Sequence, residues 1–283
     1  MRSLNANDGW TVTQNGFDPE GNRVFESLFS LGNGHFGGRG NHEEAYSGDS
    51  LPGNYLAGVF YPDPTRVGWW KNGYPDYFAK VLNAADWKPI HISVDGEPLD
   101  LATATIVSFK RVLHMRTGEL TRSFRATLPN GVTVDVETIR FVSIVRKHLG
   151  AIRYRITAVD ADVSIEVSAQ VNGDVVNQDS NYDEGFWDEV SQDVDGHRAT
   201  VVSRTKKTEF ECATATTFEV RVDGELVQPT TEPVTTTRFA AVEFELSATA
   251  GQTVEITKFG ANATSREMAA EDIVGCCHEV LDQ

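Results

Sequence analysis

The chain has 283 residues, of which 40% are hydrophobic and 23% charged, so it can bury a sizeable core and is not expected to be disordered. Its formal net charge of −16 disfavours nucleic acid and anionic membrane surfaces as partners, because both attract basic proteins. No run of about 18 apolar residues exists that could span a bilayer. Small neutral or weakly charged molecules therefore remain as the expected ligands.

Cysteine and histidine show no metal-binding spacing along the chain. The three cysteines are Cys212, Cys276 and Cys277, and sequence neighbours such as the last two rarely bridge each other. The seven histidines include no i, i+4 pair of the kind found in zinc hydrolases. The first residues contain no apolar run typical of a signal peptide. We therefore expect reduced thiols, a cytoplasmic protein, no metal and no cofactor.

Residues 32–87 are rich in Gly, Asn, Pro and aromatic residues, and a loop region of this length is usually functional. The run Gly32-Asn-Gly34-His-Phe-Gly37 fits the dinucleotide fingerprint G-x-G-x-x-G, which requires a helix directly after it. The further glycines and the proline that follow would break such a helix, and βαβ alternation is absent elsewhere. A dinucleotide site is therefore not expected.

From about residue 88 to residue 260, apolar and polar residues alternate in short runs. Period two with one apolar face predicts antiparallel strands that are buried on one side. The pairs Asp95-Gly96, Asn130-Gly131, Asp195-Gly196 and Asp223-Gly224 are typical of tight hairpin turns. Together these signals predict an all-β fold, a large antiparallel β-sandwich. The clearest alternating runs are 132–137, 152–156, 163–167, 218–222 and 242–246.

One helix is predicted, over residues 264–282. The run Thr264-Ser-Arg-Glu267 has the form of a capping box, which marks a helix start. An apolar stripe at helical spacing follows it, and such a stripe must be buried against a partner. The chain ends two residues after the stripe, so we interpret the helix as a link to a further domain. The stripe comprises Ala270, Ile273, Val274, Cys277, Val280 and Leu281.

An acidic segment with aromatic residues lies at 182–189. Glycosidases need carboxyl groups, and aromatic rings stack on sugars, so Tyr182 and Trp187 are candidate sugar contacts. In so acidic a chain, the favoured alternative is a solvated loop. No serine lies in a G-x-S-x-G nucleophile elbow, so serine hydrolysis has no support.

Residues 25–44, with the sequence FESLFSLGNGHFGGRGNHEE, resemble the opening motif of glycoside hydrolase family 65. The resemblance continues at 55–59, 87–96 and 110–122, and the tail from residue 257 is similar to the family's link to its catalytic barrel. Residues 150–250 resemble the family mainly in their pattern. The family includes maltose, trehalose, kojibiose and nigerose phosphorylases and some trehalose hydrolases.

The resemblance implies a galactose-mutarotase-like super-sandwich over residues 1–262 and a linker helix over residues 263–283 that leads to an (α/α)₆ catalytic barrel. The family's general acid, a glutamate, and its phosphate-binding residues lie in that barrel, so no residue of this chain is expected to be catalytic. The implied reaction of the whole enzyme is inverting phosphorolysis of an α-linked glucose disaccharide, with inorganic phosphate as co-substrate. A homodimer is implied for the full enzyme, and hydrolysis by water is left open.

The leading hypothesis is therefore a non-catalytic domain that contacts its own catalytic barrel. Glycines around Arg39 would let the backbone approach another surface closely, and the alternative is a tight turn with Arg39 in an ion pair. An independent carbohydrate-binding module is the second reading of the chain. A complete small glycosidase is the third, although the sequence shows no opposed carboxylates. The residues expected to face the barrel are Asn33, His35, Arg39, Trp69 and Trp70.

Overall fold

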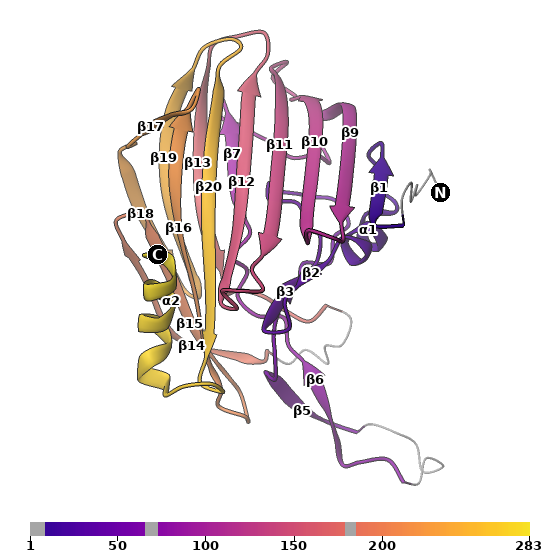
Figure 1. Cartoon of the computed structure of the whole chain (residues 1–283), viewed down its shortest axis with the longest axis vertical. Helices are drawn as coiled ribbons and strands as arrows, with labels where there is room; N and C mark the ends of the chain where they lie inside the picture. The colour runs from indigo at the N-terminus through magenta and orange to yellow at the C-terminus, as the bar shows by residue number, and fades with distance from the viewer. Residues whose placement is uncertain (1–8, 66–72, 179–184) are drawn as a thin grey trace.

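The computed structural model describes residues 9–65, 73–178 and 185–283, which form two stacked antiparallel sheets with smaller hairpins at one end (Figure 1). Every strand pair among these residues is antiparallel. The large sheet has ten strands, and β17 (Glu225–Val227) pairs with β16 beside its main path. That path runs β1 (Thr11–Asn15), β9 (Thr105–His114), β10 (Glu119–Thr127), β11 (Thr133–Val142), β12 (Leu149–Ala158), β20 (Thr253–Thr264), β16 (Glu211–Val222), β15 (Arg198–Thr205) and β14 (Trp187–Asp195).

The second sheet has five strands and covers the inner face of the large one. Two further small sheets lie at one end of the sandwich, and the hairpin of β5 and β6 projects away from its body (Figure 1). The five strands follow the order β18 (Thr231–Thr236), β19 (Phe239–Ala248), β13 (Val163–Asn172), β7 (Ile90–Val94) and β8 (Glu97–Pro98). The small sheets are β2 (Leu31–Gly32), β3 (Phe36–Gly38) and β4 (Asn54–Leu56), and β5 (Phe60–Pro64) with β6 (Tyr77–Val81).

This architecture confirms the predicted all-β super-sandwich, and each of the five alternating runs lies in a long strand. The pair Asp95-Gly96 forms a two-residue hairpin between β7 and β8 with positive φ angles of 51° and 75°. Asp223-Gly224 does the same between β16 and β17, with φ angles of 48° and 88°. Such primed turns match the twist of the flanking strands, which is why these dipeptides predict hairpins well.

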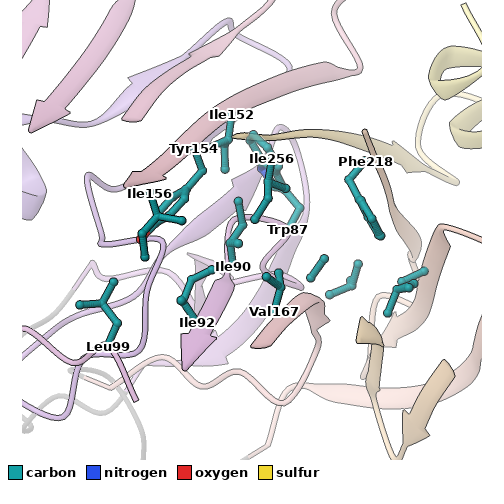
Figure 2. Close-up of a cluster of buried hydrophobic side chains, with 14 of the residues drawn as sticks. Trp87, Ile90, Ile92, Leu99, Ile152, Tyr154, Ile156, Val167, Phe218 and Ile256 are labelled. Carbon is teal, nitrogen blue, oxygen red and sulfur yellow. The ribbon is translucent and has the colours of Figure 1, made fainter. Parts of the chain in front are cut away.

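The core lies between the two sheets, where isoleucine, valine and aromatic side chains interdigitate around Trp87 (Figure 2). Gly150 of β12 and Gly260 of β20 are paired in register, and the indole ring of Trp87 packs against both. A Cβ at Gly150 would lie 2.6 Å from Trp87, and one at Gly260 would lie 2.3 Å from it. Since real Cβ contacts are never so short, any larger residue would displace the ring.

The C-terminal helix is shorter than predicted. Helix α2 spans Ile273–Leu281 and follows a 3₁₀ turn, η1 (Ala270–Asp272). The predicted capping box is wrong as a helix start: Thr264 ends β20, and the backbone N–H of Glu267 donates to the Thr264 carbonyl in a separate turn. The local sequence favours a helix cap at Thr264, but the pairing of Thr264 with Cys212 of β16 extends strand β20 to this residue.

The apolar stripe of α2 packs on the outer face of the large sheet (Figure 1). Ile273 and Cys277 are fully buried against small side chains that leave room for a helix. The sandwich itself is therefore the partner that the stripe requires. The small residues beneath the helix are Ala213 and Ala215 of β16 and Ala261 and Ala263 of β20.

Helix α1 (Asn22–Leu28) is absent from the sequence prediction. The helix has only about two turns, and its buried face includes the polar residues Asn22 and Glu26. Because these buried positions are polar, the sequence shows no apolar repeat at helical spacing. Phe25 and Phe29 pack at the end of the large sheet beside Leu113 and Leu120. Within the described part of the chain, no helix is long and apolar enough to cross a membrane.

Candidate functional site

The segment that carries the family-like motif crosses one end of the large sheet, and three arginines of this sheet form hydrogen bonds with it. Arg111 of β9, Arg122 of β10 and Arg140 of β11 are all buried on adjacent strands. Arg111 Nη1 donates to the Gly40 carbonyl at 2.6 Å, and Arg140 Nη1 donates to the Asn41 carbonyl at 3.2 Å. Arginines on the inner face of the sheet thus supply the hydrogen-bond donors that the buried glycine-rich backbone needs.

Arg122 is the centre of a buried ionic cluster with Glu43 and Glu44. Arg122 Nη2 lies 2.8 Å from both carboxylate oxygens of Glu44 and also donates to Glu43 Oε2. Arg140 Nη1 lies 3.1 Å from Glu43 Oε1, and the Tyr154 hydroxyl donates to Glu44 Oε1 at 2.8 Å. Each carboxylate is therefore paired with an arginine and hydrogen-bonded, which is the condition for keeping such charges out of water.

The charges of this cluster determine the protonation of its members. Burial alone would raise the pKa of Glu43, but Arg122 and Arg140 outweigh it and hold that pKa below its ordinary value. Burial, together with the charge of Glu44, raises the pKa of Tyr154 well above its ordinary value. Glu43 is therefore ionised and Tyr154 neutral at pH 7. A paired, ionised Glu43 is unsuited to act as a general acid.

His42 borders this cluster and is neutral, because burial and the charge of Arg122 hold its pKa well below 6.5. Its Nδ1 accepts from Arg122 Nη1 at 3.2 Å, so the single ring proton is on Nε2. Neither His42 Nε2 nor the Tyr46 hydroxyl has a hydrogen-bond partner among the described residues. Both residues line a cleft of ≈ 470 Å³, together with Asn83, Asp86 and Asp100.

Arg39 lies inside the domain, with 14% of its side chain exposed. Its Nη2 donates to the Arg23 carbonyl at 2.8 Å and lies 3.8 Å from the buried carboxylate of Glu26. Glu26 in turn accepts from the Leu51 N–H at 2.8 Å and from the Ser50 hydroxyl at 2.6 Å. Arg39 therefore connects helix α1 to the glycine-rich segment, and its proposed role toward a barrel stays a prediction.

Asn33 organises the turn between β2 and β3. Its side-chain oxygen accepts from the N–H groups of His35 at 2.9 Å and Phe36 at 3.0 Å. Its amide nitrogen donates to the carbonyls of Ser143 at 2.7 Å and Lys147 at 2.8 Å, in the turn between β11 and β12. The dinucleotide-like run is thus a β-hairpin that is hydrogen-bonded to a second turn, and the next element along the chain is strand β4.

His35 lies next to His148 and Glu267, a group that the sequence analysis did not find. Nδ1 of His35 is 3.2 Å from Glu267 Oε1, and Nε2 of His148 is 3.8 Å from Glu267 Oε2. The imidazole centroids are 4.3 Å apart. Burial and the nearby His148 lower the pKa of His35, so the ring is neutral at pH 7. Because the three residues come from three distant segments, no local spacing could reveal them.

The remaining predicted site residues divide into two groups. Trp69, Trp70 and Tyr182 lie outside the described residues. Trp187, at the start of β14, is 5% exposed and donates its indole N–H to the Asn83 carbonyl at 2.8 Å. Its role as a sugar contact stays a prediction, which the burial of the ring disfavours.

Several known proteins are similar to this chain in sequence or in fold. The profile of the N-terminal domain of glycosyl hydrolase family 65 matches residues 12–283. The maltose phosphorylase of Bacillus subtilis is 44% identical over 203 residues, which are 72% of this chain and 27% of that protein. The α,α-trehalose phosphorylase of Thermoanaerobacter brockii is 29% identical over 98% of this chain and 37% of its own length.

A solved structure described as a putative kojibiose phosphorylase from human microbiome has the same fold, with a TM-score of 0.82 and 20% sequence identity. The match covers 97% of this chain and 34% of the chain in that structure. The fold is an antiparallel β-sandwich with a C-terminal helix. The chain belongs to glycosyl hydrolase family 65, as the N-terminal domain of that family. It spans between 27% and 37% of the length of these relatives.

Proposed function

We propose that this chain is the non-catalytic N-terminal domain of a phosphorylase that cleaves an α-linked glucose disaccharide. The observation that supports this most is the family match over residues 12–283, with maltose and trehalose phosphorylases among the relatives. The ionic cluster fits a supporting role, because Glu43 and Glu44 are both neutralised by arginines and are buried. A domain built in this way would present a rigid glycine-rich edge to a catalytic barrel.

In the proposed enzyme, a barrel glutamate protonates the glycosidic oxygen while inorganic phosphate attacks the anomeric carbon from the opposite face. The C–O bond to the acceptor sugar breaks, the acceptor leaves with the proton, and β-glucose 1-phosphate forms. Phosphate is a co-substrate, and the reaction requires no organic cofactor. We place the enzyme in the cytoplasm as a homodimer. A family 65 hydrolase, in which activated water replaces phosphate, is the alternative.

An independent carbohydrate-binding role is a second candidate function, and the cleft beside His42 favours it. His42 and Tyr46 line this cleft together with the polar residues Asn83, Asp86 and Asp100. Sugar hydroxyls donate and accept hydrogen bonds, so a small polyol would match the polar side chains of this lining.

The 283-residue chain is expected to release no glucose 1-phosphate from maltose, trehalose or kojibiose in the presence of phosphate. The measurement is an enzyme-coupled assay on purified chain, accompanied by calorimetric titration with the same sugars. Turnover that persists after repurification and is lost in Glu44→Gln would contradict the non-catalytic proposal. Saturable sugar binding that His42→Ala abolishes would support the second candidate instead.

A further inference from the structure

Three turns meet at the end of the sandwich and bring His35, His148 and Glu267 together. His35 lies between β2 and β3, His148 directly before β12, and Glu267 between β20 and η1. Their potential ligand atoms all lie within 4.8 Å of one another. Zinc bound to imidazole nitrogen and carboxylate oxygen has metal–ligand distances of about 2.0–2.2 Å, so tetrahedral ligands are roughly 3.4 Å apart. Small side-chain adjustments suffice to reach that spacing.

Both imidazoles face the same backbone carbonyl on their other side. His148 Nδ1 lies 2.8 Å from the Asn262 carbonyl oxygen, and His35 Nε2 lies 3.3 Å from it. A neutral imidazole has a single N–H, and a metal-binding histidine usually donates this N–H to a carbonyl or carboxylate. When each ring donates to this carbonyl, His35 Nδ1 and His148 Nε2 are the nitrogens that face Glu267 and are free to bind a metal.

The carbonyl that orients both rings is itself held firmly. Asn262 lies in β20 with its side chain fully buried, and its Oδ1 accepts from the Thr214 hydroxyl at 2.9 Å. Its backbone N–H donates to the His148 carbonyl at 3.1 Å. Such an outer layer of hydrogen bonds fixes the ring orientations before any ligand arrives, which is the arrangement that supports metal sites.

One cation already contacts the group from the solvent side. Lys147 Nζ lies 3.1 Å from Glu267 Oε1, and its side chain is 54% exposed. Lys147 donates to Oε1 of Glu267, whereas Oε2 is the oxygen nearer to His148 Nε2, at 3.8 Å, and remains for a metal. The carboxylate is 32% exposed, whereas the two histidines are 8% and 13% exposed, so a fourth ligand position would open toward solvent.

We propose that His35 Nδ1, His148 Nε2 and Glu267 Oε2 form a zinc site with three protein ligands and one open position for water. The nitrogen and oxygen donor set suits Zn²⁺ among the common divalent ions. The site joins the glycine-rich hairpin to the turn before α2. Zinc therefore stabilises the end of the domain that carries the family-like motif.

The test is calorimetric titration of ZnCl₂ into the untagged chain after removal of metals with a chelator. One zinc ion per chain should bind with a Kd in the micromolar range or below. His35→Ala, His148→Ala and Glu267→Gln should each weaken binding at least tenfold, whereas Lys147→Ala should bind zinc as tightly or more tightly. At a zinc concentration about 100 times Kd, the Tm of the unaltered chain should rise by about 4–5 °C.

Two control variants separate this site from other zinc-binding groups. His114→Ala removes a histidine of β9 that is far along the chain from the three turns, and Cys276→Ser removes the more exposed of the two α2 thiols. Both should leave the zinc affinity unchanged. Glu267→Gln changes one atom on a partly exposed side chain, so the variant should fold. Absence of stoichiometric binding, or binding that Glu267→Gln and His35→Ala leave intact, would overturn the proposal.

Discussion

Replacing Arg122 with alanine is expected to lower the free energy of unfolding by about 3–5 kcal/mol, because it leaves the buried carboxylate of Glu44 without its arginine and leaves Glu43 with Arg140 alone. Arg122 contacts Glu43 and Glu44, whose side chains are 3% and 0% exposed. Urea denaturation of the purified chain measures the change. The closely matched control is Arg125→Ala in the same strand, since Arg125 pairs with Asp135 at 2.6 Å on the exposed side of β10. That variant should lose much less stability, because both partners of this ion pair are exposed to solvent.

A double variant distinguishes lost charge pairing from lost packing. Arg122→Met together with Glu44→Gln removes one positive and one negative charge, retains similar side-chain volumes and leaves Glu43 paired with Arg140. Much of the stability lost in Arg122→Ala should return, because no carboxylate remains without an arginine. An equal loss in Arg122→Ala and Arg125→Ala would contradict the assignment of the buried cluster as the principal support of the glycine-rich segment.

The contribution of Lys258 to the stability of the chain is expected to rise between pH 7 and pH 10. This side chain is fully buried in β20, and its Nζ donates to the Pro89 carbonyl at 2.7 Å and the Gln170 carbonyl at 2.6 Å. Burial lowers the pKa of Lys258 to about 7, against the opposing charge of Asp86. A neutral amine keeps two N–H donors, so it still satisfies both carbonyls after losing its proton.

The direction follows from proton binding in the two states. Between about pH 7 and pH 10 the unfolded chain holds a proton on this lysine that the folded chain has released, so raising the pH favours folding. The expected gain is about 2–4 kcal/mol over that range. The measurement compares urea unfolding at both pH values in the unaltered chain and in Lys258→Met, where this contribution should vanish. Lys110→Met, on an exposed position of β9, should retain it, and parallel pH profiles for all three proteins would contradict the assignment.

Local patterns predicted the strands well because period two and Asp-Gly turns act over a few residues. The same patterns contained a signal for the buried arginines. Arg111 is two residues from Phe109 and from Leu113, so it lies on the same face of β9, and all three side chains are buried. An arginine on the apolar side of a predicted strand therefore indicated a buried partner, although only the fold identifies that partner as the glycine-rich backbone.

Other features depend on contacts between segments far apart in the sequence. Thr264-Ser-Arg-Glu267 satisfies the local rule for a helix cap, yet pairing with β16 keeps Thr264 in a strand. The group of His35, His148 and Glu267 exists only because three turns meet at one end of the sandwich. Sequence spacing cannot reveal such a meeting, since each turn contributes a single residue.

The most direct test of the proposed supporting role is a chimera with the Bacillus subtilis maltose phosphorylase, which is 44% identical to this chain over 203 residues. The N-terminal domain of that enzyme would be replaced by residues 12–283 of this chain, and maltose phosphorolysis would be measured beside the catalytic part alone. Circular dichroism and a single melting transition would first establish that both proteins are folded. We expect the chimera to form β-glucose 1-phosphate at a rate at least tenfold above that of the catalytic part alone. A folded chimera no more active than the catalytic part alone would contradict the proposal that this domain supports the active site.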